Sequence, residues 1–399
     1  MKRARIATYL ANLLDHFDTS LYGFLVPILA PLFFPHSDPT VALIQGYAVV
    51  VVGLITRPLG AWYYSKKAQR DGPQSAFINT IQGMTLTTLA FVLVNPYSDW
   101  GAYGALSLCL LRGMQNFFGA GENSIAGLYV LENAEPNQQH PISCLYLGTQ
   151  MGGILLAGAV ANLLFYIKEP QMYWKWPFFG ALITGICCWW LRRQPGINWI
   201  RLPNTRVKYN WRGILQVIPM AGLYYLTYSV SFVFFNSFAN ILTGIDIAKL
   251  MTANTAFMFY DLILLILLGQ MLRNIKCVPI LRTASIALII LTPLLFSLMP
   301  SAQFVGLCVI RIILVTLGVI FCIPLHRWYL EQFSKENRYT TSAIGTAIGT
   351  EVIGRSFPAV GLALWHFSHM PIVPGLYIAL IGVLALMSLG KSTSEKKYF

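Results

Sequence analysis

The sequence predicts an all-α membrane protein with twelve transmembrane helices, arranged as two parallel six-helix halves. Three observations support this prediction. Only 11% of the residues are charged and 56% are hydrophobic, whereas a soluble domain carries about 25% charged residues. Twelve apolar segments are long enough to cross a bilayer, which takes about 20 residues. Finally, two short motifs recur at about half the length of the chain, which is typical of parallel repeats.

The apolar segments follow one another with turn-forming sequences between them, such as PHSDP and NPYSDW. The longest polar stretch lies near the middle of the chain. We therefore predict an N-terminal six-helix half at 1–191, a cytoplasmic linker at 192–212 and a C-terminal six-helix half at 213–399. The predicted spans are 7–33, 40–64, 75–95, 101–131, 142–167, 175–191, 213–240, 249–272, 279–299, 302–325, 340–366 and 371–390.

Basic residues gather on one side of this predicted bundle. With the N-terminus inside, 21 of the 28 lysines and arginines fall in cytoplasmic segments. Lys168, Lys175 and Lys249 fall outside, and the other four basic residues lie within spans. The positive-inside rule then places both termini in the cytoplasm and the protein in the plasma or inner membrane. The same asymmetry explains the net charge of +13 without nucleic acid as a partner.

The repeated motifs lie in corresponding spans of the two halves. The sequence LCLLR at 108–112 returns as LCVIR at 307–311, and GTQMGG at 148–153 returns as GTEVIG at 349–354. Both pairs run in the same direction across the membrane. They predict two repeats related by an axis along the membrane normal.

Two acids in the first span are the most informative charges. Asp15 and Asp18 are three residues apart and share a helix face, and Tyr22 lies seven residues after Asp15. A carboxylate in hydrocarbon is costly unless it is paired or faces water. We predict that at least one of them, with Asp18 favoured, carries a coupled proton. The alternative is a static ion pair with an arginine of a neighbouring helix.

Two arginines lie at equivalent depths in the fourth and tenth spans. Arg112 and Arg311 could together clamp an anion across a central cavity, because a guanidinium offers a planar fork to a carboxylate. Arg112 could instead simply neutralise Asp15 or Asp18. Gln115 lies three residues after Arg112 and shares its face. We predict that all three contact the substrate.

Further charges lie inside the other spans. Glu351 and Arg355 are four residues apart, an orientation that favours mutual neutralisation, although Glu351 could also be a second proton site or a gate. Asp261 has no partner in its own helix, and we expect it to pair with Arg311 or Arg355. Arg57 and Glu122 are expected to be structural or gating charges, with Glu122 in an interhelical or loop pair.

The seventh span has no charge but is rich in polar and aromatic side chains. Tyr228 and Asn236 belong to this group, and with Tyr22 they are further candidate substrate contacts. Such a span can line a wet cavity and can stack on or hydrogen-bond an amphiphilic ligand.

Several local motifs resemble the metabolite:proton symporter branch of the major facilitator superfamily. The branch has a first helix patterned N-x-x-E-W-Y-D-x-x-L-Y-G, an R-P-L-G start to the loop after the second span, and R-x-x-Q-x-x-x-x-G-G-E in the fourth. The matching residues here are Asn12, Asp15, His16, Phe17, Asp18, Leu21, Tyr22 and Gly23, then Arg57, Pro58, Leu59 and Gly60, then Arg112, Gln115, Ala120, Gly121 and Glu122. The resemblance implies the major facilitator fold and proton-driven transport of carboxylates or zwitterionic osmolytes.

The chain departs from the superfamily in its loop signature, G-x-x-x-D-R-x-G-R-[RK]. Residues 65–74 read SKKAQRDGPQ, so Arg70 remains but Gln69 stands where the superfamily has aspartate. That aspartate helps to lock the cytoplasmic side, as the resemblance implies. Arg70 is therefore a candidate gating charge, and other pairs are expected to contribute to gating here.

We predict a proton-coupled symporter that imports a small organic anion, such as a carboxylate, a polycarboxylate or a citrate-like siderophore. The alternatives are an exporter of a drug or metabolite on the same fold and a non-transporting membrane receptor. The partners are the substrate, protons and the lipid bilayer, and we expect a monomer. The sequence has no phosphate-cradling loop, nucleophile–base constellation or metal cluster, so we expect no enzyme activity, cofactor or metal site.

Overall fold

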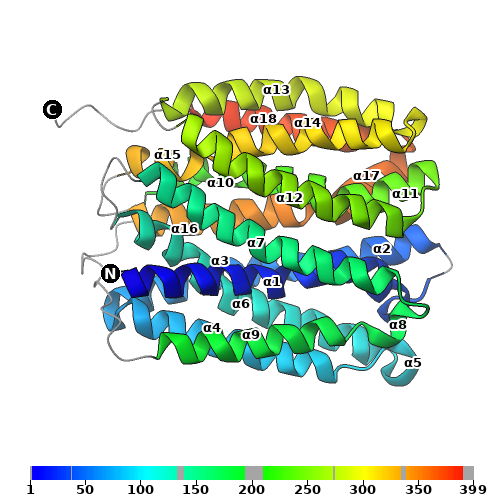
Figure 1. The fold of residues 1–399 in the computed structure, drawn as a ribbon, viewed down its shortest axis with the longest axis horizontal. Helices are drawn as coiled ribbons and strands as arrows, with labels where there is room; N and C mark the ends of the chain where they lie inside the picture. Colours follow the sequence, from blue (N-terminus) through cyan, green and yellow to red (C-terminus); the bar gives the residue numbers. More distant parts are fainter. Residues whose placement is uncertain are drawn as a thin grey trace.

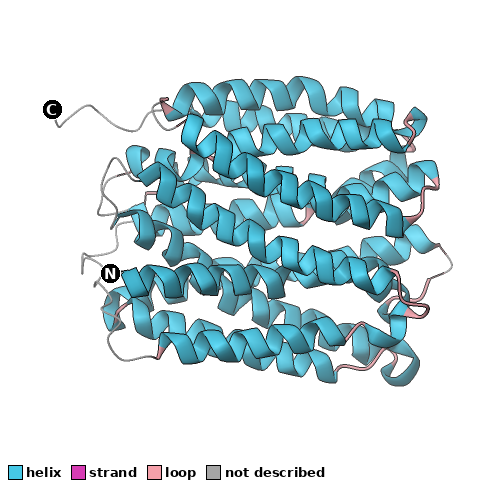
Figure 2. Cartoon of the chain, viewed as in Figure 1, coloured by secondary structure: helices cyan, strands magenta, loops and turns pink. Residues whose placement is uncertain are grey.

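The computed structural model describes residues 2–36, 38–132, 139–193, 210–272, 275–333 and 338–389. Within these ranges every regular element is a helix (Figure 2). Most of the predicted linker, at 194–209, lies outside the described residues. The predicted domain boundaries therefore stay a prediction.

The first part of the chain forms six long helical crossings with short helices in the loops. The elements are α1 (Lys2–Phe33), α2 (Pro39–Ala48), η1 (Val49–Val52), α3 (Gly53–Asp71), α4 (Pro73–Leu93), α5 (Tyr97–Trp100), α6 (Ala102–Glu132), α7 (Gln139–Phe165), α8 (Pro170–Tyr173) and α9 (Trp176–Arg192). The second crossing is the joined stretch α2–η1–α3, which extends beyond the predicted 40–64.

The second part of the chain forms six further crossings. Its elements are α10 (Trp211–Tyr228), η3 (Ser229–Phe234), α11 (Phe235–Thr243), α12 (Ile247–Met271), α13 (Cys277–Leu298), η4 (Met299–Ser301), α14 (Phe304–Cys322), α15 (Leu325–Gln332), α16 (Arg338–Gly349), η5 (Thr350–Arg355), α17 (Phe357–Ser368) and α18 (Ile372–Leu389). Both η3 and η5 are π-helical, and they interrupt the first and fifth crossings of this half. Such segments occur often at functional sites.

The crossings lie side by side along one common direction, and α1 begins at the end of the bundle where α18 ends (Figure 1). Among the described residues, eight helical stretches are long and apolar enough to cross a membrane. The twelve-helix bundle is completed by α1, α6, α9 and the stretch α16–η5–α17. The outer helix α13 exposes Ile286, Ile290, Leu294 and Leu298 in one stripe, a surface that suits lipid tails.

Turn chemistry sets several helix ends. Asp38 caps α2, because its side chain accepts a hydrogen bond from the Thr40 amide at 2.8 Å. That bond holds the pKa of the Asp38 carboxyl below its usual range. Between α3 and α4 the chain turns at Gly72, whose φ of 90° disfavours any residue with a side chain. The break between these helices therefore follows from the sequence itself.

The repeated glycine motifs pack in the same way in both halves. A Cβ on Gly153 of α7 would fall on the Leu13 carbonyl of α1, and a Cβ on Gly354 of η5 would fall on Tyr225 of α10. In each half, the fifth crossing thus approaches the first crossing closely at the end of the motif. The motif is repeated because this helix contact is repeated.

Candidate functional site

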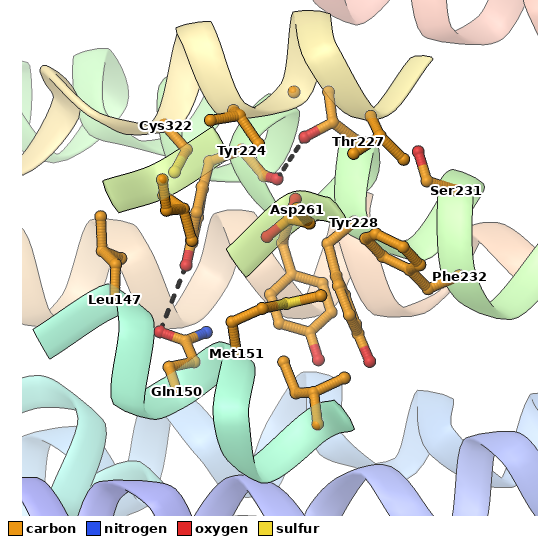
Figure 3. A pocket seen from close by; sticks show the side chains of 16 residues that line it. Leu147, Gln150, Met151, Tyr224, Thr227, Tyr228, Ser231, Phe232, Asp261 and Cys322 are labelled. Carbon is orange, nitrogen blue, oxygen red and sulfur yellow. Dashed lines mark hydrogen bonds between the residues drawn. The ribbon is translucent and has the colours of Figure 1, made fainter. Parts of the chain in front are cut away.

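The two halves enclose a central cavity of about 50 Å³ (Figure 3). The N-terminal half contributes Gln150 and Met151 from α7, and the C-terminal half contributes Tyr224 and Tyr228 from α10. Asp261 of α12 completes the polar lining. The halves contact each other through α7 with α12, through α16 with α3 and α6, and through α17 with α2. The cavity is therefore a chamber that both halves line.

Asp261 is the charged group of this chamber. It is 8% exposed, lines the cavity together with the tyrosines of α10, and interacts electrostatically with Tyr228 (Figure 3). No described basic residue lies within 4.0 Å of its carboxylate, so the expected pairs with Arg311 and Arg355 are not formed in the structure. A cavity lined by a carboxylate and several tyrosines is suited to a ligand cation, because both a carboxylate and an aromatic face attract positive charge.

A second cavity of about 80 Å³ adjoins the first and shares Gln150, Tyr224 and Tyr225 with it. It also crosses between the halves, with Arg57 of α3 on one side and Arg355 of η5 on the other. We call it the triad cavity, because its two arginines belong to an ion triad.

The arginine–glutamate triad consists of Arg57, Glu351 and Arg355. Glu351 Oε1 lies 2.9 Å from Arg57 Nε and 3.0 Å from Arg355 Nε. All three side chains are buried. The expected contact between Glu351 and Arg355 is therefore present, and Arg57, predicted to be structural or gating, joins them from the other half. This triad ties α3 to η5, and because its members are buried their charges interact more strongly than on the surface.

The N-terminal half holds a second polar cluster, which we call the Asp18 network: Asp18, Thr88, Gln115 and Arg112. The Thr88 hydroxyl donates to Asp18 Oδ2 at 2.7 Å, and the Gln115 amide donates to Thr88 at 3.0 Å. Arg112 donates to Gln115 Oε1 at 2.8 Å and to the Thr19 carbonyl at 2.6 Å. Gln115 thus connects the acid to the arginine across three helices, α1, α4 and α6.

Asp15 and Asp18 both line a small cavity of about 30 Å³ between α1, α4 and α9, inside the N-terminal half. Asp15 Oδ2 lies 3.8 Å from His16 Nδ1, which in turn bonds the Asn12 carbonyl at 2.8 Å. Asp15 also lies close enough to Arg57 and Arg355 to interact with them electrostatically. The two acids therefore face different charges, although they share one helix.

The C-terminal half holds the counterpart of Arg112, which we call the Arg311 network: Arg311, Asn236 and Asn254. Arg311 Nη2 donates to Asn236 Oδ1 at 2.6 Å, and Nη1 donates to Asn254 Oδ1 at 3.4 Å. The guanidinium lies 4.1 Å from the Phe235 ring centroid. Among the described residues no carboxylate lies within 4.0 Å of it. It is a buried positive charge held by amides and an aromatic face.

The structure separates some of the residues that the sequence grouped together. Neither Arg112 nor Arg311 is among the lining residues of the two cavities between the halves. Tyr22 donates to the Gly46 carbonyl at 2.7 Å, and its ring centroid lies 4.9 Å from the Arg112 guanidinium. Tyr228, by contrast, lines the central cavity. Arg70 is exposed and lies 3.7 Å from Asp71. The side chain of Glu122 lies outside the described part of the structure.

Some residues of these sites were missed by sequence reasoning. Thr88 and Asn254 carry no charge, and polar residues are common in membrane helices, so nothing in the sequence marked them. Gln150 lies in the repeated motif GTQMGG and Tyr225 in the polar seventh span, but neither was predicted to be a site residue. Asn116 is one turn after Arg112, and that spacing could have indicated it. It is 1% exposed, and its amide atoms have no hydrogen-bond partner among the described residues.

The chain matches the model of the Major Facilitator Superfamily over residues 8–357 and therefore belongs to this family. The fold is similar to that of a D-xylose–proton symporter, with a TM-score of 0.75, 13% identity and 98% of both chains covered. It is also similar to the human organic anion transporter MFSD10, with a TM-score of 0.69, 13% identity, and 97% and 99% of the two chains covered. The predicted twelve-helix fold is thereby confirmed.

The curated relatives are transporters as well. The chain is 25% identical to the proline/betaine transporter of Escherichia coli strain K12, over 97% of this chain and 82% of that one. It is 24% identical to the glycine betaine/proline/ectoine/pipecolic acid transporter of Dickeya dadantii, with the same coverage. A proline/betaine transporter of Salmonella typhimurium is 31% identical over 48% of this chain and 39% of its own. The protein is thus an integral membrane transporter and not an enzyme.

Proposed function

We propose that this member of the Major Facilitator Superfamily is a proton-coupled symporter that imports a small zwitterion with a cationic ammonium group and one carboxylate. It works in the plasma or inner membrane as a monomer, with both termini in the cytoplasm. The two halves rock around the central cavity, and an inward proton gradient supplies the energy. This proposal narrows the organic anion expected from the sequence to a molecule that also carries a positive charge.

The observation that carries the proposal is Asp261 in the central cavity. Its carboxylate interacts electrostatically with Tyr228, shares the cavity with Tyr224, and has no basic partner within 4.0 Å among the described residues. An isolated carboxylate is costly in such a place unless it serves a ligand or a proton. Aromatic faces next to it favour a quaternary or secondary ammonium group. A purely anionic substrate would be repelled by this charge.

The names of the relatives agree with this chemistry. The Escherichia coli relative is called a proline/betaine transporter, and the Dickeya dadantii relative carries glycine betaine, ectoine and pipecolic acid in its name as well. All of these molecules pair a carboxylate with a nitrogen cation or its equivalent. By contrast, a polycarboxylate or a citrate-like siderophore finds no support in these names. The cavities of about 50 and 80 Å³ also favour a small substrate.

The proton site is proposed to be Asp18, with Asp15 beside it. Asp18 is buried and bonded to Thr88, and it lies outside the two cavities between the halves. A proton can therefore bind there without occupying the space of the substrate. Arg112 and Arg311 are proposed to position the helices of their own halves, rather than to contact the substrate directly.

Uptake into proteoliposomes tests the proposal. The purified protein is reconstituted, an inward proton gradient is imposed, and labelled glycine betaine, proline, succinate and citrate are offered separately. Glycine betaine or proline is expected to accumulate, and succinate and citrate are not. Asp261→Asn should weaken uptake by about 10- to 100-fold, because a charge-assisted contact contributes about 1.5–3 kcal/mol.

Asp99→Asn is the matched control, since Asp99 lies on the exposed loop helix α5. It should leave uptake unchanged. Accumulation of citrate without glycine betaine or proline would contradict the proposal, and so would unchanged uptake in Asp261→Asn.

A further inference from the structure

The arginine–glutamate triad joins the two halves with unequal charge. Arg57 comes from α3, whereas Glu351 and Arg355 come from η5, so two guanidinium groups share one carboxylate. The three side chains are 4%, 1% and 6% exposed. Within the triad two cations face one anion, and Asp15 of α1 is a further acid that interacts electrostatically with both arginines.

The donors of this triad are only partly used. Although the ion-pair distances are short, both carboxylate oxygens of Glu351 lack an aligned hydrogen bond among the described residues. The same holds for Nε and Nη2 of Arg57 and for Nε of Arg355. The two Nε atoms face Glu351 without aligned geometry, whereas Nη2 of Arg57 has no partner among the described residues. Because a guanidinium can offer two parallel bonds to one carboxylate, Arg57 still has capacity for a ligand. Buried donors without partners are costly, and a ligand would relieve that cost.

An uncharged residue next to the triad also lacks hydrogen-bond partners. Asn116 of α6 is buried, and both of its amide atoms lack a partner among the described residues. A Cβ on Gly53 would fall on the Glu351 carboxylate and on the Asn116 amide. Glycine at this position therefore leaves the room in which the acid and the amide meet. The triad and Asn116 therefore form a buried polar cluster rather than a surface ion pair.

Several charged and titratable groups around the triad determine the electrostatic potential at its arginines. Arg57 and Arg355 line the triad cavity together with His16 and Tyr225. The guanidinium of Arg355 lies 4.8 Å from the Tyr225 ring centroid. Asp15 interacts electrostatically with both arginines from α1 and partly offsets their charge. The cavity adjoins the chamber of Asp261, since both contain Gln150, Tyr224 and Tyr225.

We infer that Arg57 and Arg355 form the binding site for the carboxylate of the substrate, and that Glu351 holds this site while the substrate is absent. The inference rests on the proposed function, which places the ammonium group at Asp261. The substrate carboxylate competes with Glu351 for the two arginines. Arg57 and Arg355 belong to different halves. When the substrate replaces Glu351, the two halves are therefore connected through the substrate carboxylate.

Binding measurements with three small probes test this inference. Glycine betaine carries both charged groups, choline lacks the carboxylate, and acetate lacks the ammonium group. Isothermal titration of the full-length protein in detergent gives the Kd of each probe. Glu351→Gln should lower the Kd of glycine betaine and of acetate by about tenfold or more, because the freed arginines gain a charge-assisted bond. The Kd of choline should stay the same.

The matched control is Glu331→Gln, because Glu331 forms a half-exposed pair with Arg327 on α15. It should change no Kd. A second variant protects the test if Glu351→Gln does not fold: Arg355→Gln should raise the Kd of glycine betaine about tenfold and leave that of choline unchanged.

Equal carboxylate affinities in the wild-type protein and Glu351→Gln would overturn the inference. It would also be overturned by a gain for choline as large as that for glycine betaine, because this would indicate general loosening. If choline and glycine betaine bind neither protein but acetate binds Glu351→Gln more tightly, the carboxylate site stands and the proposed zwitterion is wrong.

Discussion

The Asp18 network and the Arg311 network are two versions of one arrangement. Arg112 and Arg311 end the repeated motifs LCLLR and LCVIR. Each is buried, and each donates at 2.6 Å to the first crossing of its own half, Arg112 to the Thr19 carbonyl and Arg311 to Asn236. Each also lies against an aromatic ring, at 4.9 Å from Tyr22 and 4.1 Å from Phe235.

The difference lies in the acid. The N-terminal network includes Asp18, whereas the C-terminal network contains the amides Asn236 and Asn254 and no acid among the described residues. A carboxylate can take and release a proton, but an amide cannot. The comparison therefore suggests that one half of a duplicated scaffold handles the proton, while the other keeps a permanent positive charge.

The largest expected difference between the two networks appears when each arginine is removed in a separate variant. Arg112→Met removes the cation that Gln115 links to Asp18 and should cost about 3 kcal/mol of stability or more, because the cost of a lost partner is larger for a buried charged group than for a neutral one. Arg311→Met leaves only neutral amides without their partner and should cost about 1–3 kcal/mol. Thermal unfolding in detergent measures both. Equal losses, or a larger loss for Arg311→Met, would contradict the assignment of the acid to one half only.

The motif glycines test whether the two halves pack alike. Gly153→Ala presses a methyl group onto the backbone of α1, and Gly354→Ala presses one onto Tyr225 of α10. Each should lower stability by about 1–3 kcal/mol, since a packed helix contact has no room for it. Gly180→Ala on α9 is the control, because its Cβ would meet open space. A loss in only one of the two motifs would show that the halves do not pack alike.

The smallest expected effect concerns one hydrogen bond to the acid. Thr88→Val removes the 2.7 Å bond to Asp18 and keeps the shape of the side chain. It should slow proton-driven uptake several-fold. Thr87→Val is the matched control, since Thr87 bonds only the carbonyls of Gly83 and Met84 in its own helix. Identical uptake in the two variants would mean that Thr88 does not serve the proton site.

Much of the fold could be predicted from the sequence. Long apolar segments and the repeated motifs were enough for the twelve crossings, because a chain in lipid must satisfy its backbone within helices. The contact between Glu351 and Arg355 was also predictable, since residues four apart meet on one helix. The π-helical form of η5 was not predictable, because it depends on how the fifth crossing packs against α10.

Side-chain contacts between helices that are distant in the sequence could not be predicted from the sequence. Arg57 meets Glu351 from the opposite half of the chain, and no periodicity relates the two. The sequence suggested that Arg112 and Arg311 face a common cavity, but their Nη1 and Nη2 atoms donate to partners within their own halves. These partners are Thr19, Gln115, Asn236 and Asn254. Depth in the membrane can be counted along a helix, but the direction of a long side chain depends on its neighbours.

The most direct test of the account compares wild-type protein and Asp18→Asn in proteoliposomes. Two quantities are measured for glycine betaine: accumulation driven by an inward proton gradient, and exchange of labelled for unlabelled substrate without a gradient. The account predicts that Asp18→Asn abolishes accumulation and keeps exchange, because the substrate site between the halves stays intact. Accumulation at the wild-type level in Asp18→Asn would contradict it, and the proton site would then have to lie elsewhere.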